Sequence, residues 1–330
     1  MTVRAVALLS GGLDSMLAIR LLQMQGVEVE ALNFRTTFTC CQNQAAAAAA
    51  ELGVRLTVVA EQDDYLDVVR NPRHGYGRGA NPCVDCRIYM FRLAARWRRE
   101  SGADMVISGE VVGQRPMSQK KRDLALIAHR ARLDDHLLRP LSARLLPPTA
   151  AERDKLVDRE RLFGFSGRGR TELIALAKKL GLRRIPQPSN GCALTEPRFA
   201  AKVHDLLGSE ASADRWQFEL LRIGRHVRFD RTTKVILGRR ADENEQLARM
   251  FAQPAAGEAT LIVPENFLGP TALVVGPAME DHFDFAGGLI LRYAKVDSAV
   301  AAPTAWVNHA GIRSVRPLRD HAAAFVAETI

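Results

Sequence analysis

The chain has 330 residues, of which 47% are hydrophobic and 25% are charged, and its formal net charge is +9. This is ordinary globular composition, and it excludes general disorder. The apolar runs are all shorter than the roughly 18 residues of a membrane-spanning helix, and the N-terminus lacks a signal-peptide pattern. We therefore expect a cytoplasmic protein with no membrane partner.

The first half of the chain alternates short apolar runs with helical patterns. Strands are predicted at residues 3–9, 27–34, 54–60 and 105–108, and helices at residues 15–25, 42–52 and 87–100. This alternation predicts βαβ units and an α/β fold with a parallel, doubly wound sheet. Ligands bind such sheets at the carboxyl ends of the strands. Further helical patterns follow at residues 152–161 and 171–180.

The pattern changes beyond about residue 210. Short β-like runs occur at residues 234–237, 260–263, 271–275 and 289–293, with glycine and proline turns between them. We therefore predict two domains: a catalytic domain over residues 1–205 and a smaller α+β domain over residues 206–330.

The positive charge is unevenly placed. Residues 1–200 hold 31 basic and 21 acidic side chains, whereas residues 201–330 hold 15 and 16; within the second part, residues 215–240 hold eight basic and two acidic ones. Arg92, Arg96 and Arg99 share one helical face, and a second cluster lies at residues 115–122. Such charges either solvate a helix or track the phosphates of a nucleic acid, the leading candidate partner.

A glycine-rich segment follows the first predicted strand and opens the first predicted helix. It reads Ser10-Gly11-Gly12-Leu13-Asp14-Ser15. The glycines allow backbone N–H groups to turn toward an anion, and the helix N-terminus adds partial positive charge. No lysine follows, so this is not the Walker-type loop. The segment predicts a phosphate-binding loop.

A second polar loop is expected to face the phosphate loop. Gly109 and Glu110 end the strand predicted at residues 105–108. The side chains that follow, Gln114, Arg115, Ser118 and Gln119, are suited to contacts with a nucleotide or an acceptor. The alternative is an ordinary solvated loop.

All five cysteines lie in the first 192 residues: Cys40, Cys41, Cys83, Cys86 and Cys192. An odd number in a reducing compartment favours metal or redox chemistry over disulfides. Cys83 and Cys86 stand just before a predicted helix, whose N-terminus should lower the pKa of both thiols. With Cys192 they could hold a [4Fe–4S] cluster with one open iron, form an incomplete zinc site, or serve as a persulfide relay.

Two neighbouring features are less specific. Cys40 and Cys41 are expected to be buried structural cysteines, with an auxiliary sulfur carrier as the alternative. Asp85, between the two cysteines of the CxxC pair, could act as an acid or base or could cap the helix.

The segment S-G-G-L-D-S after the first strand resembles the PP-loop ATP pyrophosphatase family. The resemblance implies that ATP is cleaved between its α- and β-phosphates, so that pyrophosphate leaves and AMP stays on an acceptor oxygen. It implies that Ser10, Gly11, Gly12 and Ser15 cradle the pyrophosphate and that Asp14 helps to hold Mg²⁺. Gly109 and Gln114 are predicted to complete the nucleotide site.

Three further segments narrow the resemblance: N-P-C-V-D-C-R at residues 81–87, G-E-V-V-G-Q-R-P-M-S-Q at 109–119 and G-C-A-L-T-E-P at 191–197. Together they resemble the PP-loop tRNA thiolation enzymes, which include 4-thiouridine synthetases and 2-thiouridylases. These adenylate a base carbonyl oxygen, and sulfur then displaces AMP. Asp14, Cys83, Cys86 and Cys192 would be the catalytic residues, and the three cysteines match the pattern that binds a [4Fe–4S] cluster.

The resemblance leaves several points open. It implies tRNA as a partner and requires a sulfur donor, which could be sulfide, a persulfide or a carrier protein. The oligomeric state, a homodimer included, is not specified. Two other hypotheses stand beside tRNA thiolation: an adenylating PP-loop enzyme with a small-molecule or protein acceptor, and a non-catalytic protein that binds nucleotide or RNA.

The chain departs from the 4-thiouridine synthetases in one respect. Those enzymes carry an N-terminal THUMP RNA-binding region, whereas the phosphate loop here begins at Ser10. We therefore expect no THUMP domain and assign RNA docking to the C-terminal domain. Its residues 215–240 interleave basic and apolar side chains, as an edge strand with a cationic face would, and faintly resemble the RNA-binding segment of NFACT-type proteins.

Overall fold

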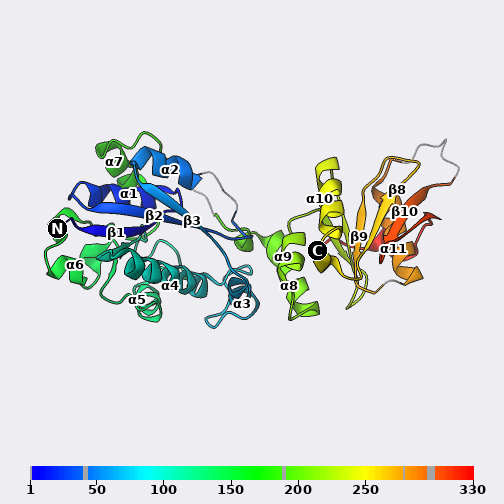
Figure 1. Cartoon of the computed structure of the whole chain (residues 1–330), viewed down its shortest axis with the longest axis horizontal. Helices are drawn as coiled ribbons and strands as arrows, with labels where there is room; N and C mark the ends of the chain where they lie inside the picture. Colours follow the sequence, from blue (N-terminus) through cyan, green and yellow to red (C-terminus); the bar gives the residue numbers. More distant parts are fainter. Residues whose placement is uncertain (1, 40–43, 188–190, 278, 296–301) are drawn as a thin grey trace. The chain divides into compact units, whose positions relative to one another are not determined.

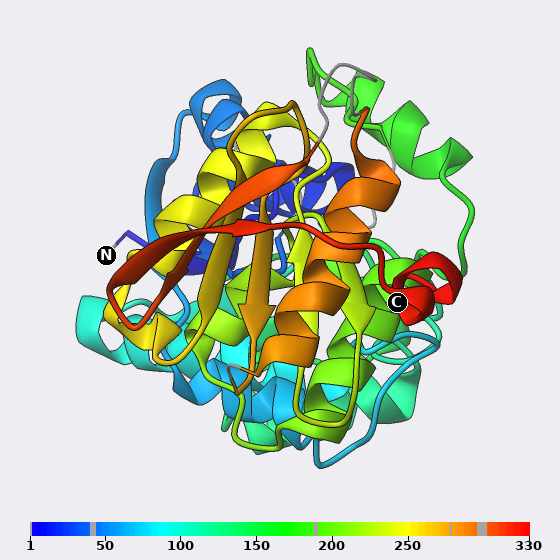
Figure 2. The same ribbon diagram turned by 90° about the vertical axis from the view of Figure 1, so that its right-hand side faces the viewer.

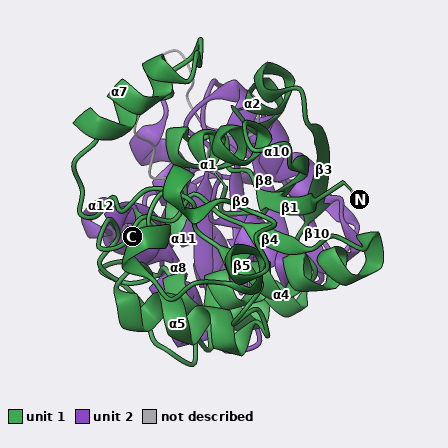
Figure 3. Ribbon diagram, turned by 90° about the vertical axis from the view of Figure 1, so that its left-hand side faces the viewer, with its two compact units in different colours: residues 1–195 green, residues 196–330 purple. Residues whose placement is uncertain are grey.

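The computed structural model describes residues 2–39, 44–187, 191–277, 279–295 and 302–330. The chain divides into two compact units, Met1–Thr195 and Glu196–Ile330 (Figure 3). The domain boundary predicted at residues 205 and 206 falls inside helix α8 (Pro197–Ser209).

The first unit is built on a parallel sheet of five strands in the order β3-β2-β1-β4-β5. The strands are β1 (Arg4–Leu8), β2 (Glu28–Arg35), β3 (Arg55–Ala60), β4 (Met105–Ile107) and β5 (Leu137–Leu138). The order runs outward in both directions from the β1–β4 pair, which is therefore the topological switch point. The predicted doubly wound α/β fold is confirmed.

Helices cover both faces of this sheet (Figure 1). On one face, α1 (Leu13–Gln23), α2 (Gln44–Leu52) and α7 (Thr171–Lys179) share a core with alternate sheet residues. On the other face, α4 (Cys83–Ser101) and α5 (Lys121–Arg130) pack over a second core. The short helix α3 (Asp64–Arg70) packs against α4.

Two predicted helices of this unit differ in the structure. Helix α4 begins at Cys83, so the CxxC pair lies in its first turn and not before it. The helix predicted at residues 152–161 is broken into α6 (Ala150–Arg153) and the 3₁₀ turn η2 (Arg159–Arg161). Lys155 lies between them in a left-handed conformation, with φ of 59°, which a continuous helix excludes. Two further 3₁₀ turns are η1 (Ala143–Leu145) and η3 (Ala193–Thr195).

The second unit contains an antiparallel sheet of six strands in the order β11-β10-β8-β9-β7-β6 (Figure 2). Its strands are β6 (Arg225–Arg228), β7 (Lys234–Leu237), β8 (Thr260–Pro264), β9 (Ala272–Val275), β10 (Thr304–His309) and β11 (Ile312–Pro317). The predicted α+β domain is confirmed, and β6 lies at an edge of the sheet.

Helices pack on both faces of this second sheet as well. Helices α11 (Glu280–Tyr293) and α12 (Ala322–Val326) lie over one face. Helices α9 (Arg215–Leu220) and α10 (Ala241–Phe251), with the 3₁₀ turn η4 (Pro254–Ala256), lie over the other. The strand predicted at residues 289–293 is wrong, because these residues form the last turns of α11. A short apolar run does not distinguish a buried strand from a buried helical face.

Among the described residues, no helix combines the length and the apolar character needed to cross a lipid bilayer.

Candidate active site

The phosphate loop connects β1 to α1 at the switch point of the parallel sheet. Gly12 is the N-cap of α1, and the Ser15 hydroxyl donates a hydrogen bond to the Gly12 carbonyl oxygen at 2.8 Å. The Gly12 N–H donates to Ser10 Oγ at 3.3 Å. Gly11 has φ of +81°, and a Cβ there would lie 2.5 Å from the carbonyl carbon of Gln44. Glycine is therefore required at Gly11 by both conformation and space.

Asp14 stands in the first turn of α1, directly after the glycines. Burial raises the pKa of its carboxyl group, while a hydrogen bond from Gln114 and the charges of Arg170 and Arg115 act in the opposite direction. The Gln114 side-chain amide donates to Asp14 Oδ2 at 2.9 Å. A carboxylate that is partly desolvated and faces cationic groups is suited to holding a cation between itself and phosphate oxygens.

The loop after β4 lies directly against the phosphate loop. A Cβ on Gly109 would lie 2.4 Å from the carbonyl carbon of Asp14 and 2.4 Å from the Ser15 nitrogen. Only glycine permits this close approach, which brings Gln114 to Asp14. Ser118 and Gln119 of the same loop are buried. The structure thus places Gly109 and Gln114 beside the loop as expected, while their role in nucleotide binding stays a prediction.

The two cysteines of the CxxC pair each accept a hydrogen bond. The Asn81 amide donates to Cys83 Sγ at 3.0 Å, and the Tyr65 hydroxyl donates to Cys86 Sγ at 3.3 Å. Burial raises the pKa of Cys86, and the Tyr65 hydrogen bond and the Arg87 charge only partly offset this. The predicted lowering of the Cys86 pKa is therefore wrong, because desolvation of the thiolate outweighs the helix N-terminus.

Cys192 reaches the same region from a distant part of the sequence. Its backbone forms an antiparallel bridge with Thr39, and the Ala193 N–H donates to the Phe38 carbonyl oxygen at 2.8 Å. On the other side, the Ala80 N–H donates to the Leu194 carbonyl oxygen at 3.0 Å. The segment that carries Cys192 is thus held between the end of β2 and the residues that precede α4.

Shared electrostatic partners link the three cysteines to the phosphate loop. The thiols of Cys86 and Cys192 both act on the buried Tyr65, and those of Cys83 and Cys192 both act on Arg115. Arg115 also interacts with Asp14. One unit therefore gathers the predicted phosphate loop and the predicted cysteine centre around Arg115.

The described residues do not form a ready metal site. Among them, no three or more Cys, His, Asp or Glu side chains are grouped closely enough to hold a metal ion. The cysteines that they include, Cys83, Cys86 and Cys192, are free thiols. Cys40 and Cys41, predicted as structural cysteines, lie outside the described residues. The role of these three thiols as cluster ligands stays a prediction.

Asp85 has a different partner from the one expected of a helix cap. Its two carboxylate oxygens face His74: the backbone N–H donates to Oδ2 at 2.8 Å, and the ring Nδ1 lies 2.7 Å from Oδ1. Helix α4 starts after Pro82 without a side-chain cap. Asp85 therefore ties the loop before α4 to the turn that carries the cysteines.

No sequence pattern indicates the buried ion pairs that link the loop after β4 to the cysteine helix α4. Glu110 and Arg139 are both buried, and Arg139 Nε donates to Glu110 Oε2 at 2.9 Å. The other carboxylate oxygen, Oε1, lies 3.7 Å from Nε of Arg87, the residue after Cys86. Oε1 has no hydrogen-bond partner among the described residues. Arg139 directly follows the short apolar strand β5, and Tyr65 lies in an acidic segment, so no sequence pattern marks either residue and only the fold identifies them.

The basic segment of the second unit is partly neutralised. Arg228 and Lys234 both pair with Asp205, and Lys234 is buried. Arg239 pairs with Glu243 and Arg240 with Asp242. The cationic face expected at the β6 edge is therefore smaller than the sequence predicts, because acidic partners come from α8 and α10.

Comparison with known families agrees with this geometry. Residues 1–144, which contain the phosphate loop, the CxxC pair and the loop after β4, match the family model described as "Thiamine biosynthesis protein (ThiI)". Over these residues the N-terminal unit is thus similar to the PP-loop family. Residues 224–320 match the model described as "NFACT protein RNA binding domain". Both resemblances noted in the sequence are thereby confirmed.

Curated relatives of the PP-loop domain are tRNA-modifying enzymes. The chain is 31% identical over 216 residues to a protein named tRNA-specific 2-thiouridylase MnmA from Methylobacterium radiotolerans, a match that covers 60% of this chain and 53% of that protein. A protein of the same name from Pelobacter propionicus is 30% identical, and the match covers 48% of this chain and 49% of that protein. The chain thus spans about half the length of these relatives.

Among solved structures, one similar chain is a 4-thiouridine synthetase in complex with RNA and ATP. It is 23% identical, with a TM-score of 0.41, and the match covers 59% of this chain and 46% of that chain. Another is described as a predicted subunit of tRNA methyltransferase from Methanocaldococcus jannaschii, at 15% identity and a TM-score of 0.36, over 53% and 74% of the two chains.

Proposed function

We propose that the chain is an ATP-dependent tRNA sulfurtransferase. In this proposal the PP-loop domain adenylates a carbonyl oxygen of a uridine and releases pyrophosphate. Sulfur delivered at a centre formed by Cys83, Cys86 and Cys192 then takes the place of AMP. The observation that carries the proposal is the match of residues 1–144, which hold the phosphate loop and the CxxC pair, to the family model described as "Thiamine biosynthesis protein (ThiI)". The geometry supports it, because Gln114 of the loop after β4 donates to Asp14 of the phosphate loop at 2.9 Å.

The adenylation step requires stabilisation of negative charge as pyrophosphate leaves. The uridine oxygen attacks the α-phosphorus, and the bond between the α-phosphorus and the bridging oxygen to the β-phosphate breaks. Backbone N–H groups of residues 10–15 and the N-terminus of α1 are suited to bind the departing pyrophosphate. Asp14 would contribute one oxygen ligand to Mg²⁺, which needs few protein carboxylates when phosphates supply the remaining ligands.

The sulfur step exchanges one bond for another at the same ring carbon. A sulfur nucleophile forms a C–S bond, and the C–O bond to AMP breaks, so that AMP leaves with the oxygen and the bonding electrons. Hydrogen bonds from Asn81 and Tyr65 to the two sulfurs of the CxxC pair favour anionic or electron-rich sulfur there. The donor that supplies the sulfur is sulfide, a persulfide or a carrier protein.

The second unit is proposed to dock the RNA. Its match to the NFACT RNA-binding model supports this role, as does the edge formed by β10 and β11. The guanidinium of Arg313 lies over the ring of Trp306, 4.1 Å from the ring centroid. A cationic group stacked on an aromatic ring is a recurrent surface for single-stranded nucleic acid.

The decisive experiment is the thionucleoside profile of total tRNA, measured by mass spectrometry in cells with and without the gene. Loss of one thiolated nucleoside on deletion, restored by the wild-type gene and not by Asp14→Ala, is the expected result. Asp14→Ala should also lower pyrophosphate release by at least about 10²-fold, because a charge-stabilising ligand of the transition state is removed. An unchanged profile would instead favour an acceptor other than tRNA.

A second experiment separates the two forms of the sulfur centre. The cysteine pattern that resembles cluster-binding enzymes predicts that anaerobic reconstitution with iron and sulfide produces a [4Fe–4S] chromophore, which Cys192→Ser abolishes. A relay predicts no chromophore. It predicts instead that a persulfide donor transfers its outer sulfur to one of the three cysteines and leaves as a thiol, and that mass spectrometry detects the cysteine persulfide formed. In either case Cys192→Ser should bind ATP normally and fail to thiolate. A variant that thiolates fully would refute the assignment of Cys192.

A further inference from the structure

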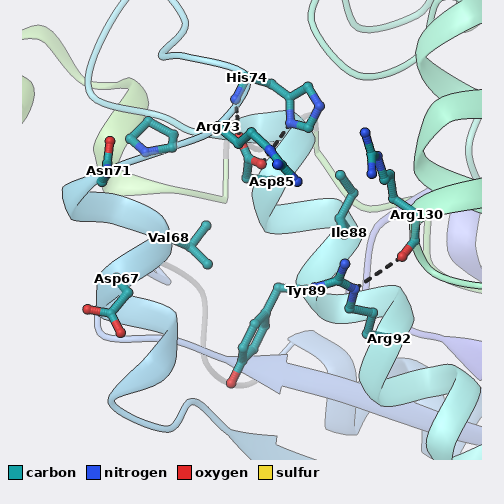
Figure 4. A pocket seen from close by; sticks show the side chains of 11 residues that line it. Asp67, Val68, Asn71, Arg73, His74, Asp85, Ile88, Tyr89, Arg92 and Arg130 are labelled. Atoms are coloured by element: carbon teal, nitrogen blue, oxygen red, sulfur yellow. Dashed lines mark hydrogen bonds and ion pairs between the residues drawn. The ribbon is translucent and has the colours of Figure 1, made fainter.

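A hollow with a cationic rim lies in the PP-loop unit beside the cysteine centre. It has a volume of about 290 Å³ and is formed by α3, the loop before α4, one face of α4 and the end of α5. Figure 4 shows its polar lining, in which Arg73, His74, Arg92 and Arg130 come from three separate segments of the chain.

The positive charge of this hollow is not balanced by its acidic residues. Asp67 pairs with Arg70 at 2.5 Å, and Asp85 is occupied by two contacts from His74. The side chains of Arg73 and Arg130 make no hydrogen bond or ion pair with the residues that the structure describes. The two acids are therefore already paired, and the arginines at the rim are available to an anion.

The arginines are also partly preorganised. Arg92 Nε donates to the carbonyl oxygen of Arg130 at 3.1 Å, which fixes the Arg92 side chain between α4 and the end of α5 (Figure 4). Val68, Ile88 and the ring of Tyr89 supply an apolar wall. An apolar wall lowers the local dielectric constant, so that the charges at the rim act more strongly on a bound anion than they would in bulk water.

The size of the hollow restricts its ligand. A volume of about 290 Å³ is at the lower limit of pockets for small molecules, so it suits a phosphate group with part of a sugar better than a whole nucleotide. Arginine is the side chain best adapted to phosphate, because its planar guanidinium donates two parallel hydrogen bonds.

The position of the hollow relates it to the reaction. Asp85 lines it and stands between Cys83 and Cys86 in the first turn of α4, where the rise is only about 1.5 Å per residue. Arg92, the rim arginine on the same helix, follows Cys86 by six residues, which is about 9 Å of helix rise. A phosphate held at the rim would therefore lie about two helical turns along α4 from the sulfur centre. We propose that this hollow binds a backbone phosphodiester of the RNA substrate, close to the nucleotide that is modified. This inference rests on the proposed function.

The test uses the full chain with Arg73→Ala and Arg130→Ala combined. Both positions are exposed, so the variant is expected to fold, which circular dichroism checks. The matched control combines Arg99→Ala and Lys121→Ala, which removes two exposed charges from α4 and α5 at positions that do not line the hollow. Binding of an unmodified tRNA transcript is followed by fluorescence anisotropy over a range of salt concentrations.

The double variant should bind tRNA about tenfold more weakly at 0.1 M salt, and the slope of log K against log salt should become shallower by about 1, the value for one lost phosphate contact. The control should change much less. Equal weakening in both proteins would overturn the proposal, because it would reduce the effect to general surface charge.

A calorimetric titration with inorganic phosphate alone distinguishes the other source of a phosphate group. Binding heat that the hollow variant loses, combined with unchanged tRNA affinity, would assign the hollow to free phosphate and overturn the RNA proposal. A different result would refute the proposed function alone. If the wild-type protein binds tRNA through the hollow but releases no pyrophosphate in the presence of ATP, tRNA and sulfide, sulfur transfer is refuted and the RNA-binding role of the hollow still holds.

Discussion

At the scale of single residues, the environment of Cys86 shows two opposing effects on one thiol. Burial raises its pKa, whereas the hydroxyl of Tyr65 and the charge of Arg87 favour the thiolate. Tyr65 is itself buried, with a pKa well above its usual value, so its hydroxyl stays a donor at neutral pH. The hydrogen bond from Tyr65 therefore favours the thiolate of Cys86, and a substitution at Tyr65 can remove it without removing the thiol.

Replacing Tyr65 by phenylalanine should make Cys86 less reactive at neutral pH. The substitution removes a hydrogen bond that stabilises the thiolate, so the pKa of Cys86 should rise by about one unit, which corresponds to roughly 1.4 kcal/mol. The measurement is the rate of alkylation of Cys86 by iodoacetamide against pH, followed by peptide mass spectrometry. The profile should move to higher pH.

Tyr89→Phe is the matched control, because the Tyr89 hydroxyl donates to Asp64 and not to a thiol, while its ring packs on that of Tyr65. This variant should leave the alkylation profile of Cys86 unchanged. Identical profiles for Tyr65→Phe and wild type would contradict the assigned role of the hydrogen bond.

At the scale of secondary-structure elements, the contact between the phosphate loop and the loop after β4 depends on a missing side chain. Gly109 lies so close to α1 that any Cβ would overlap the backbone of Asp14 and Ser15. Backbone atoms on both sides leave no flexible group that could move away. The spacing between β4 and α1 is therefore determined by glycine at this position.

Gly109→Ala should displace the phosphate loop. We expect destabilisation by about 1–3 kcal/mol, typical of overpacking, and a loss of ATP-dependent pyrophosphate release. Thermal unfolding and pyrophosphate release are the two measurements. Gly208→Ala in α8 is the control: a Cβ there meets open space, and alanine should stabilise the helix by about 0.5–1 kcal/mol. Wild-type turnover in Gly109→Ala would contradict this interpretation.

The elements around the site could be predicted because their signals are local. The alternation of apolar runs and helical patterns predicts β1 to β4 together with α1, α2 and α4, whereas α3 and α5 were not predicted. The glycines mark the phosphate loop between β1 and α1. Other contacts of the site join positions 21 to 29 residues apart in the sequence. They are the pairing of Glu110 with Arg139 and Arg87 and the contact of Tyr65 with Cys86. Such contacts follow from tertiary packing, which periodicity does not encode.

Segments whose pattern fits two structures were predicted less well. The apolar run at residues 289–293 fits a strand or a helix equally, and burial in the α11 core decides for the helix. The pKa of Cys86 could not be predicted because helix position is visible in the sequence and desolvation is not.

At the scale of the whole molecule, net charge overstates the surface available to RNA. Several arginines of the second unit are neutralised by carboxylates, notably Arg228 by Asp205 and Arg239 by Glu243. Affinity for a polyanion depends on charges that are not already paired. Under the proposed function, we therefore expect RNA contact in this unit at the β10–β11 edge, where Ile312 is exposed and Arg313 covers Trp306.

Alanine at Trp306 or Arg313 should weaken tRNA binding without affecting nucleotide binding in the absence of RNA. Loss of a base-stacking platform costs about 1–3 kcal/mol per base, which corresponds to a roughly 5- to 150-fold weaker complex. Trp306→Phe should retain most of the affinity, because it preserves an aromatic face. Arg249→Ala is the charge-matched control, since Arg249 lies on α10 and pairs with Glu245. If Arg313→Ala and Arg249→Ala bind tRNA equally well, the edge is not the RNA-binding surface, and the positive charge of the PP-loop unit must supply the affinity.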